Sequence, residues 1–202
     1  MRSRSAAAEL TGAGLNDVYS MTGGINAWHG LVAEGAPASG MATFSAATSP
    51  EVLIALAWFL EDGSRRFYSE LSVLMKDRDA QGLFKELMRA EESHQATLMK
   101  QYGEISKKTP DVNALTSLIS PEEETMEGGI PVREAISWAR GKQLSGVLEL
   151  CLALETNAYD LHLKMADRVK DEGSRQVFRV LAVEEKAHLE QLSSLLEKKL
   201  GK

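Results

Sequence analysis

The sequence predicts an all-α protein, a four-helix bundle with a long crossover between its second and third helices. Two observations lead to this fold class. Beyond residue 50, apolar residues recur with the 3.6-residue period of α-helices over long stretches. Only short connections separate the first from the second stretch and the third from the fourth, as in antiparallel helical hairpins. With 202 residues and 44% hydrophobic content, the chain is long enough to form a sizeable core.

The expected helices cover residues 50–76, 80–102, 144–169 and 174–199. Ser49 is suited to cap the first of them, and Pro50 to occupy its first turn. The segment 103–143 contains three prolines and fits a crossover that runs along the bundle. Within it, residues 132–140 predict one short additional helix.

Composition excludes several classes of protein. The net charge of −6, without a basic run, argues against nucleic-acid or anionic-membrane binding. Cys151 is the only cysteine, which excludes an intrachain disulfide and a CxxC metal site. The longest apolar run, residues 52–60, is too short to span a bilayer, and the first ten residues lack the apolar core of a signal peptide. We therefore expect a cytoplasmic protein.

One carboxylate interrupts the apolar stripe of each expected helix, and two of the four are followed by histidine one turn later. The carboxylates are Glu61, Glu91, Glu155 and Glu185, and the histidines are His94 and His188. Burying one unpaired carboxylate costs several kcal/mol, so four clustered ones require compensation. Two divalent cations would neutralise all four, and this set of oxygen and nitrogen donors favours iron or manganese over a structural zinc site.

One Glu from each of two helices and Glu-x-x-His from the other two is the ligand pattern of ferritin-like di-iron proteins. Residues 48–200 resemble the rubrerythrin branch of that superfamily. The resemblance implies two iron ions, with manganese or zinc as other occupants, held by Glu61, Glu91, His94, Glu155, Glu185 and His188. It implies no catalytic residue beyond this metal site.

Four positions near the expected site are less determined. Tyr68, seven residues after Glu61, matches the family, but His162 stands at the equivalent position of the third helix. Both are candidates for hydrogen bonds to the metal ligands, His162 is also a candidate ligand itself, and packing in the core is the alternative for each. Ala158 replaces an additional carboxylate of the peroxide-reducing members, which argues against a peroxidase. Glu184, off the inward stripe, is interpreted as a surface charge.

The amino-terminal residues 1–40, which include "GGINAW" (23–28), resemble the carboxyl-terminal end of a rhodanese domain. A linker is expected over 41–49 and the di-iron bundle over 50–202. No cysteine precedes the Arg-Ser pair at the start of this segment, where a rhodanese requires one. We therefore do not expect sulfurtransferase activity from this chain.

The function expected from these features is a non-haem di-iron oxidoreductase that reacts with dioxygen or hydrogen peroxide and receives electrons from an unknown donor. One alternative is binding and oxidation of iron without turnover of another substrate. Another is a non-catalytic partner module of a sulfurtransferase. The resemblance also implies a homodimer, and neither nucleic acid nor a membrane is expected as a partner.

Overall fold

The computed structural model describes residues 49–107, 109–119 and 124–201. The rhodanese-like segment predicted for 1–40 lies outside these residues, as does the predicted linker apart from Ser49.

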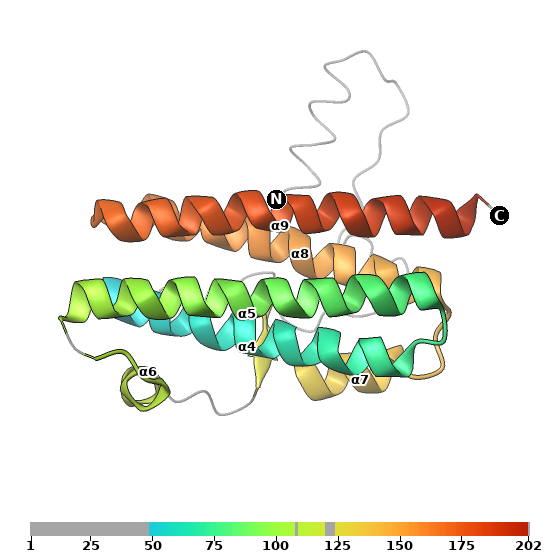
Figure 1. Cartoon of the computed structure of the whole chain (residues 1–202), viewed down its shortest axis with the longest axis horizontal. Coiled ribbons are helices and arrows are strands. Elements are labelled where there is room, and N and C mark those ends of the chain that lie inside the picture. Colours follow the sequence, from blue (N-terminus) through green and yellow to red (C-terminus); the bar gives the residue numbers. More distant parts are fainter. Residues whose placement is uncertain (1–48, 108, 120–123, 202) are drawn as a thin grey trace, which may run out of the picture. The chain divides into compact units, whose positions relative to one another are not determined.

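Four long helices form a bundle (Figure 1): α4 (Pro50–Leu74), α5 (Arg78–Ser106), α8 (Leu144–Arg168) and α9 (Glu172–Leu200). Helices α4 and α5 pack against each other as a hairpin, α8 and α9 do the same, and α5 packs against α9. The prediction of an all-α bundle with a crossover between its second and third long helices is confirmed. Over the described ranges, no helix combines the length and the hydropathy needed to cross a membrane.

Three of the long helices begin at a residue whose side chain accepts a hydrogen bond from the first turn. Ser49 accepts from the Val52 amide at 3.4 Å, as its position in the sequence predicted. Asp77 and Asp171 cap α5 and α9 through amides at 3.0 and 2.7 Å. Such caps satisfy N–H groups that have no partner within the helix. They therefore fix where each chain segment enters the bundle.

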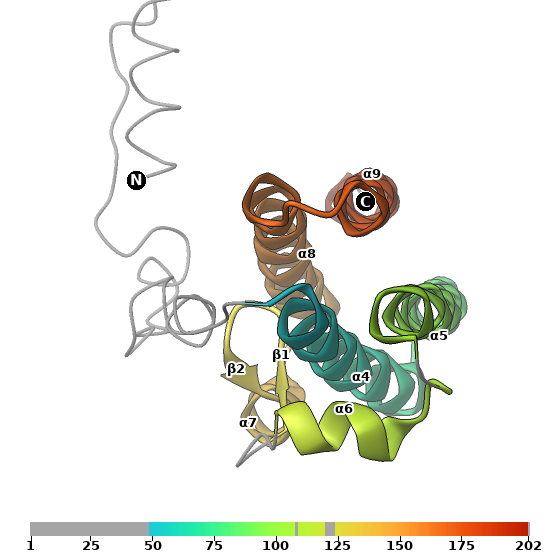
Figure 2. The same ribbon diagram turned by 90° about the vertical axis from the view of Figure 1, so that its left-hand side faces the viewer.

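The crossover contains more regular structure than the sequence predicted. The short helix expected at 132–140 is present as α7 (Val132–Ala139). It is preceded by α6 (Val112–Leu118) and by an antiparallel pair of short strands, β1 (Thr125–Met126) and β2 (Ile130–Pro131). The strand pair and α7 both lie against α4 (Figure 2). Elements this short carry no measurable periodicity, which is why the sequence did not predict them.

A glycine in the middle of α4 allows the strand pair to approach the helix backbone. A Cβ atom at Gly63 would lie 2.3 Å from the carbonyl oxygen of Thr125, so any other residue would clash with β1. The turn between the strands uses Gly128 in a left-handed conformation, with φ of 90°. This contact places the turn residue Glu127 beside α4, where it is 3% exposed.

Apolar side chains form two separate core clusters, one toward each end of the bundle. Leu148 and Leu87 belong to one cluster, and Leu98 and Leu181 to the other. The residues that the 3.6-residue period places on the inward stripes are buried, except Leu152 and Val177, which are only partly buried. Between the clusters the inward positions are polar, and these residues form the site described next.

Candidate metal centre

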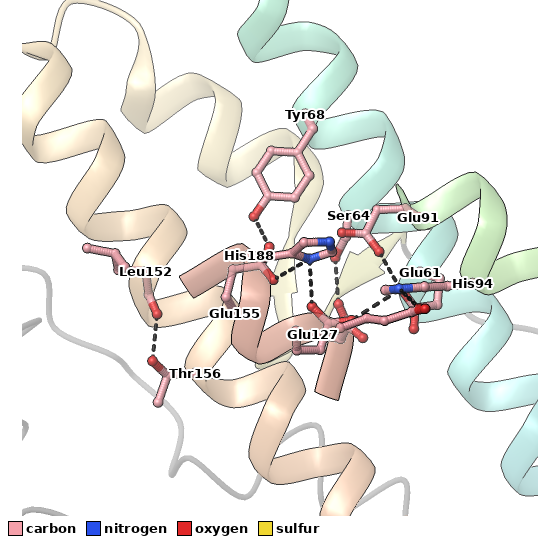
Figure 3. A network of polar contacts seen from close by, with 12 residues as sticks. Glu61, Ser64, Tyr68, Glu91, His94, Glu127, Leu152, Glu155, Thr156 and His188 are labelled. Carbon is pink, nitrogen blue, oxygen red and sulfur yellow. Dashed lines mark hydrogen bonds and ion pairs between the residues drawn. The ribbon is translucent and has the colours of Figure 1, made fainter. Parts of the chain in front are cut away.

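The six residues predicted as metal ligands meet in the interior of the bundle, and each long helix contributes one or two of them. They are Glu61 on α4, Glu91 and His94 on α5, Glu155 on α8, and Glu185 and His188 on α9. Figure 3 labels all of these residues except Glu185. None of their side chains belongs to a residue that is more than 6% exposed. The helical period thus brings residues from four distant stretches of sequence together in one buried cluster.

The first group of donor atoms surrounds the Nδ1 atom of His94. This nitrogen lies 3.0 Å from an oxygen of Glu91, 3.3 Å from one of Glu61 and 3.1 Å from one of Glu185. One donor atom from each of these four residues lies within 4.8 Å of all the others. The four atoms are therefore close enough to share one cation.

The second group has the same form and surrounds His188. Its Nδ1 atom lies 3.2 Å from an oxygen of Glu155 and 3.0 Å from one of Glu185, and Glu91 completes the group. Glu91 and Glu185 belong to both groups. A carboxylate has two oxygens, so these two residues are placed to bridge two adjacent cations.

The donor atoms are better placed to bind divalent cations than to form hydrogen bonds with one another. Both oxygens of Glu91 and one oxygen each of Glu61 and Glu185 lack a hydrogen-bond partner among the described residues. Leaving such atoms buried without a partner costs free energy. Ligands about 2.1 Å from an octahedral cation lie about 3 Å apart, which matches the spacings around His94 and His188. The residues therefore fit a pair of iron or manganese ions.

The buried carboxylates differ in pKa: that of Glu91 and of Glu155 is raised, and that of Glu61 is lowered. Burial, followed by the negative charge of Glu185, raises the pKa of both Glu91 and Glu155 well above the usual range. Burial would also raise the pKa of Glu61, but the adjacent His94 and His162 outweigh it and lower that pKa to about 2. Without metal, the cluster therefore holds protons on some carboxylates and keeps others ionised.

The histidines hold protons for the opposite reason. Burial alone would lower the pKa of His188, yet its contacts with Glu155 and Glu185 raise it to about 10. The pKa of His94 is raised as well, because Glu61 and Glu184 outweigh the effect of burial. Metal binding to either Nδ1 atom would have to displace a proton.

Two further side chains contact the predicted ligands from outside. The hydroxyl of Tyr68 donates a hydrogen bond to Glu155 and its ring stacks on Phe84, so this candidate contacts a predicted ligand. Glu184 lies 2.9 Å from the Nε2 atom of His94. The side chain is half exposed, as expected of a surface charge, but its carboxylate also reaches back to the ring.

Sequence reasoning missed one buried carboxylate at the site. Glu127, at the turn between β1 and β2, accepts a hydrogen bond of 2.8 Å from the Ser64 hydroxyl. Its other oxygen lies 3.3 Å from the Nε2 atom of His162, which in turn lies 3.1 Å from Glu61. Glu127 precedes two glycines in an irregular segment, and neither its spacing nor its neighbours distinguish it from a surface residue.

The thiol near the site is buried and unreactive. Cys151, one turn before Glu155, is fully buried, and burial raises the pKa of its thiol well above the usual value. A thiol in this state is a poor nucleophile and a poor metal ligand. Cys151 is therefore a small residue of the apolar core.

Comparison with known proteins places the bundle in a family. The model of the Rubrerythrin family matches residues 51–196. The chain is also similar to the solved structure of a hypothetical protein from Pyrococcus furiosus, with 25% identity and a TM-score of 0.59. The similarity covers 83% of this chain and 98% of that one. Among proteins with curated descriptions, none matches the sequence significantly.

Proposed function

The chain belongs to the rubrerythrin family, and from this premise we propose that it is a non-haem di-iron oxidoreductase that reacts with dioxygen or hydrogen peroxide. One observation carries the proposal: the two groups of donor atoms share Glu91 and Glu185, as two adjacent cations require. A bound pair of ferrous ions supplies the electrons that reduce such an oxidant. The protein's own residues hold the pair, limit access to it and supply protons.

Burial of the ligands supports a small oxidant. Of the six residues, His188 is the most exposed, at 6%, and Glu61 is fully buried. A large organic substrate could not contact the donor atoms without opening the bundle. Dioxygen and hydrogen peroxide are small enough to reach a centre enclosed in this way.

The imidazole of His94 is oriented from both sides. Its Nδ1 atom faces the carboxylates of the site, while its Nε2 atom lies next to Glu184. A carboxylate at the second nitrogen fixes the tautomer and increases the basicity of the first. Glu184 thereby holds the ring in the orientation that a metal ligand needs.

Tyr68 holds a proton beside Glu155. Burial, followed by the negative charge of Glu155, raises the pKa of the phenol well above its usual value, so the hydroxyl stays protonated. A protonated donor next to a ligand is placed to deliver a proton when an oxidant is reduced. We expect this residue to affect the rate of reaction more than the affinity for metal.

The function is tested by loading the protein with ferrous ion without air and mixing it with either dioxygen or hydrogen peroxide. Each peroxide molecule takes one electron from each of two ferrous ions, so the ferric absorbance should reach its full value at one equivalent of peroxide per chain. Ferrous protein that neither oxidant oxidises faster than free ferrous ion would contradict the proposal. Iron oxidation without turnover is distinguished by adding a reductant, because an oxidoreductase then consumes the oxidant repeatedly with its iron retained.

Replacement of Tyr68 by phenylalanine should slow oxidation of the loaded protein by about 10- to 100-fold, since outer contacts of ligands have effects of this size. The two-metal content should not change, because the hydroxyl is not itself a ligand. Tyr102→Phe is the matched control, a buried tyrosine in the other core cluster. Stopped-flow absorbance and metal analysis of both variants test this, and equal rates for Tyr68→Phe and wild type would contradict the role.

A further inference from the structure

We propose that Glu127 and His162, together with Glu61 and Glu185, form a third cation-binding position next to the pair. This inference rests on the proposed di-metal centre, because two of its four residues are ligands of that centre. The donor atoms of the four residues lie within 4.8 Å of one another, as they do in the other two groups. The ligand suited to them is a divalent cation such as Fe²⁺ or Mn²⁺.

Glu61 connects the third position to the first. One of its oxygens lies 3.3 Å from the Nδ1 atom of His94, and the other lies 3.1 Å from the Nε2 atom of His162. The two oxygens thus face two different imidazoles. A carboxylate arranged in this way can bridge two cations, one beside each ring.

Two of the atoms that face the third position have no hydrogen-bond partner among the described residues. Glu127 presents one oxygen, and His162 its Nε2 atom, without a hydrogen-bond partner, although the two atoms lie only 3.3 Å apart. They are close but not aligned as donor and acceptor. Atoms that share a cation have this arrangement, because each directs a lone pair at the metal rather than at its neighbour.

The surrounding structure holds both residues in place before any cation binds. The second oxygen of Glu127 accepts the hydrogen bond from Ser64, and the absence of a side chain at Gly63 lets the turn approach α4. The ring of His162 is stacked on Phe178 with an interplanar angle of 20°. A preorganised pair of donors lowers the cost of binding.

Charge also favours a third cation. Two divalent cations neutralise Glu61, Glu91, Glu155 and Glu185, and Glu127 is then a fifth buried carboxylate without a balancing charge. Burial of such a group is costly unless a positive charge lies next to it. A protonated His162 is the competing source of that charge, and it predicts two cations rather than three.

The test counts Mn²⁺ ions bound per chain, using the electron paramagnetic resonance signal of free Mn²⁺ at increasing total concentration. The wild type should bind three, the third more weakly than the pair because it shares two of their ligands. Glu127→Gln should bind two, with the third position weakened by about tenfold or more and the pair unchanged. Glutamine keeps the shape of the side chain and an oxygen that accepts from Ser64, so the turn should stay in place.

Three variants complete the test. Glu124→Gln makes the same chemical change at an exposed residue of the same segment and should bind three ions. Ser64→Ala removes the hydrogen bond to Glu127 but no donor atom, and it should still bind three. His162→Gln should bind two. Circular dichroism would verify that each variant is folded.

The outcomes separate this inference from the proposed function. Two ions in the wild type, with neither number nor affinity changed by Glu127→Gln, would overturn the third position and leave the di-metal centre standing. No bound ion in the wild type would overturn both. Loss of the third ion in Ser64→Ala with Glu127→Gln unaffected would assign the turn a structural role and would also overturn the inference.

Discussion

Glu155→Gln is expected to weaken metal binding by more than tenfold while leaving the metal-free fold at least as stable as the wild type. The substitution removes one of the four charges that balance the cations, and changes to groups that only contact ligands already cost 10- to 100-fold in affinity. The glutamine oxygen can still accept the hydrogen bond from Tyr68. In the metal-free protein the pKa of Glu155 is raised well above its usual range, so the side chain holds a proton, and a neutral amide that replaces a neutral carboxyl group should not lower the stability of the fold.

Leu148→Ala is the matched control on the same helix. Leu148 is fully buried in the apolar core, and its side chain has no atom that could bind a metal. Leu152, which the sequence placed on the inward stripe, is a poorer control because it is only partly buried. Leu148→Ala should lower the free energy of unfolding by about 2–5 kcal/mol and should keep both metals. Metal stoichiometry and the denaturant midpoint are measured for both variants. If Glu155→Gln binds metal as the wild type does, Glu155 is not a ligand.

The metal-free protein should become less stable as pH rises through the neutral range. In the metal-free protein, Glu91 and Glu155 have raised pKa values, so above the ordinary carboxyl pKa the folded state binds more protons than the unfolded state. The pKa of His188, raised to about 10, acts in the same direction from its ordinary value of 6.5 upward. Stability falls wherever the folded state binds more protons and pH rises. The metal-free bundle should therefore become less stable between about pH 6.5 and 10.

The apparent affinity for metal should instead increase as pH rises. Two cations would displace one proton each, one from His94 and one from His188, so the apparent affinity for each cation should increase by about tenfold per pH unit near neutrality, before protons from the carboxylates are counted. At a free concentration of 100 times the dissociation constant, binding stabilises the fold by about 2.7 kcal/mol. Titration calorimetry in buffers of different ionisation enthalpy measures the protons released, and thermal melts at pH 6, 7 and 8 measure the stability. A melting temperature that metal does not change at any pH would contradict the site.

Most of the fold follows from a pattern that repeats many times. Each long helix presents several turns of apolar residues, and Glu91 or Glu185 stands out because a charge occupies a position that the period assigns to the core. The same reasoning placed His162 correctly on the inward side. Predictions that rest on periodicity were therefore successful for the helices, and the predicted ligands do converge.

Periodicity did not predict the residues that a non-helical turn and a long side chain contribute to the site. Glu127 comes from a turn whose position depends on the close approach of Thr125 to Gly63, a contact between residues far apart in the sequence. Glu184 lies off the inward stripe, yet its side chain extends back to His94. Both contacts depend on three-dimensional reach rather than on spacing along the chain.

The positions of Tyr68 and His162 have a consequence for how the two halves of the bundle are related. The residues Glu155, Glu185, His188 and His162 each follow their counterparts Glu61, Glu91, His94 and Tyr68 by 94 positions. The α8–α9 hairpin is thus a second copy of the ligand arrangement of α4–α5. The site has approximate two-fold symmetry, with Tyr68 contacting Glu155 and His162 contacting Glu61 across the axis.

This symmetry is broken mainly at one pair of positions. On one side of the axis the phenol of Tyr68 donates a hydrogen bond to Glu155, and on the other side the imidazole of His162 faces Glu61. Two cations held at the proposed positions would therefore be chemically different, and the turn that carries Glu127 would add to the difference on the imidazole side. A chain with tyrosine at both positions would bring the two positions closer to equivalence, so the exchange of tyrosine for histidine is one source of the difference between them.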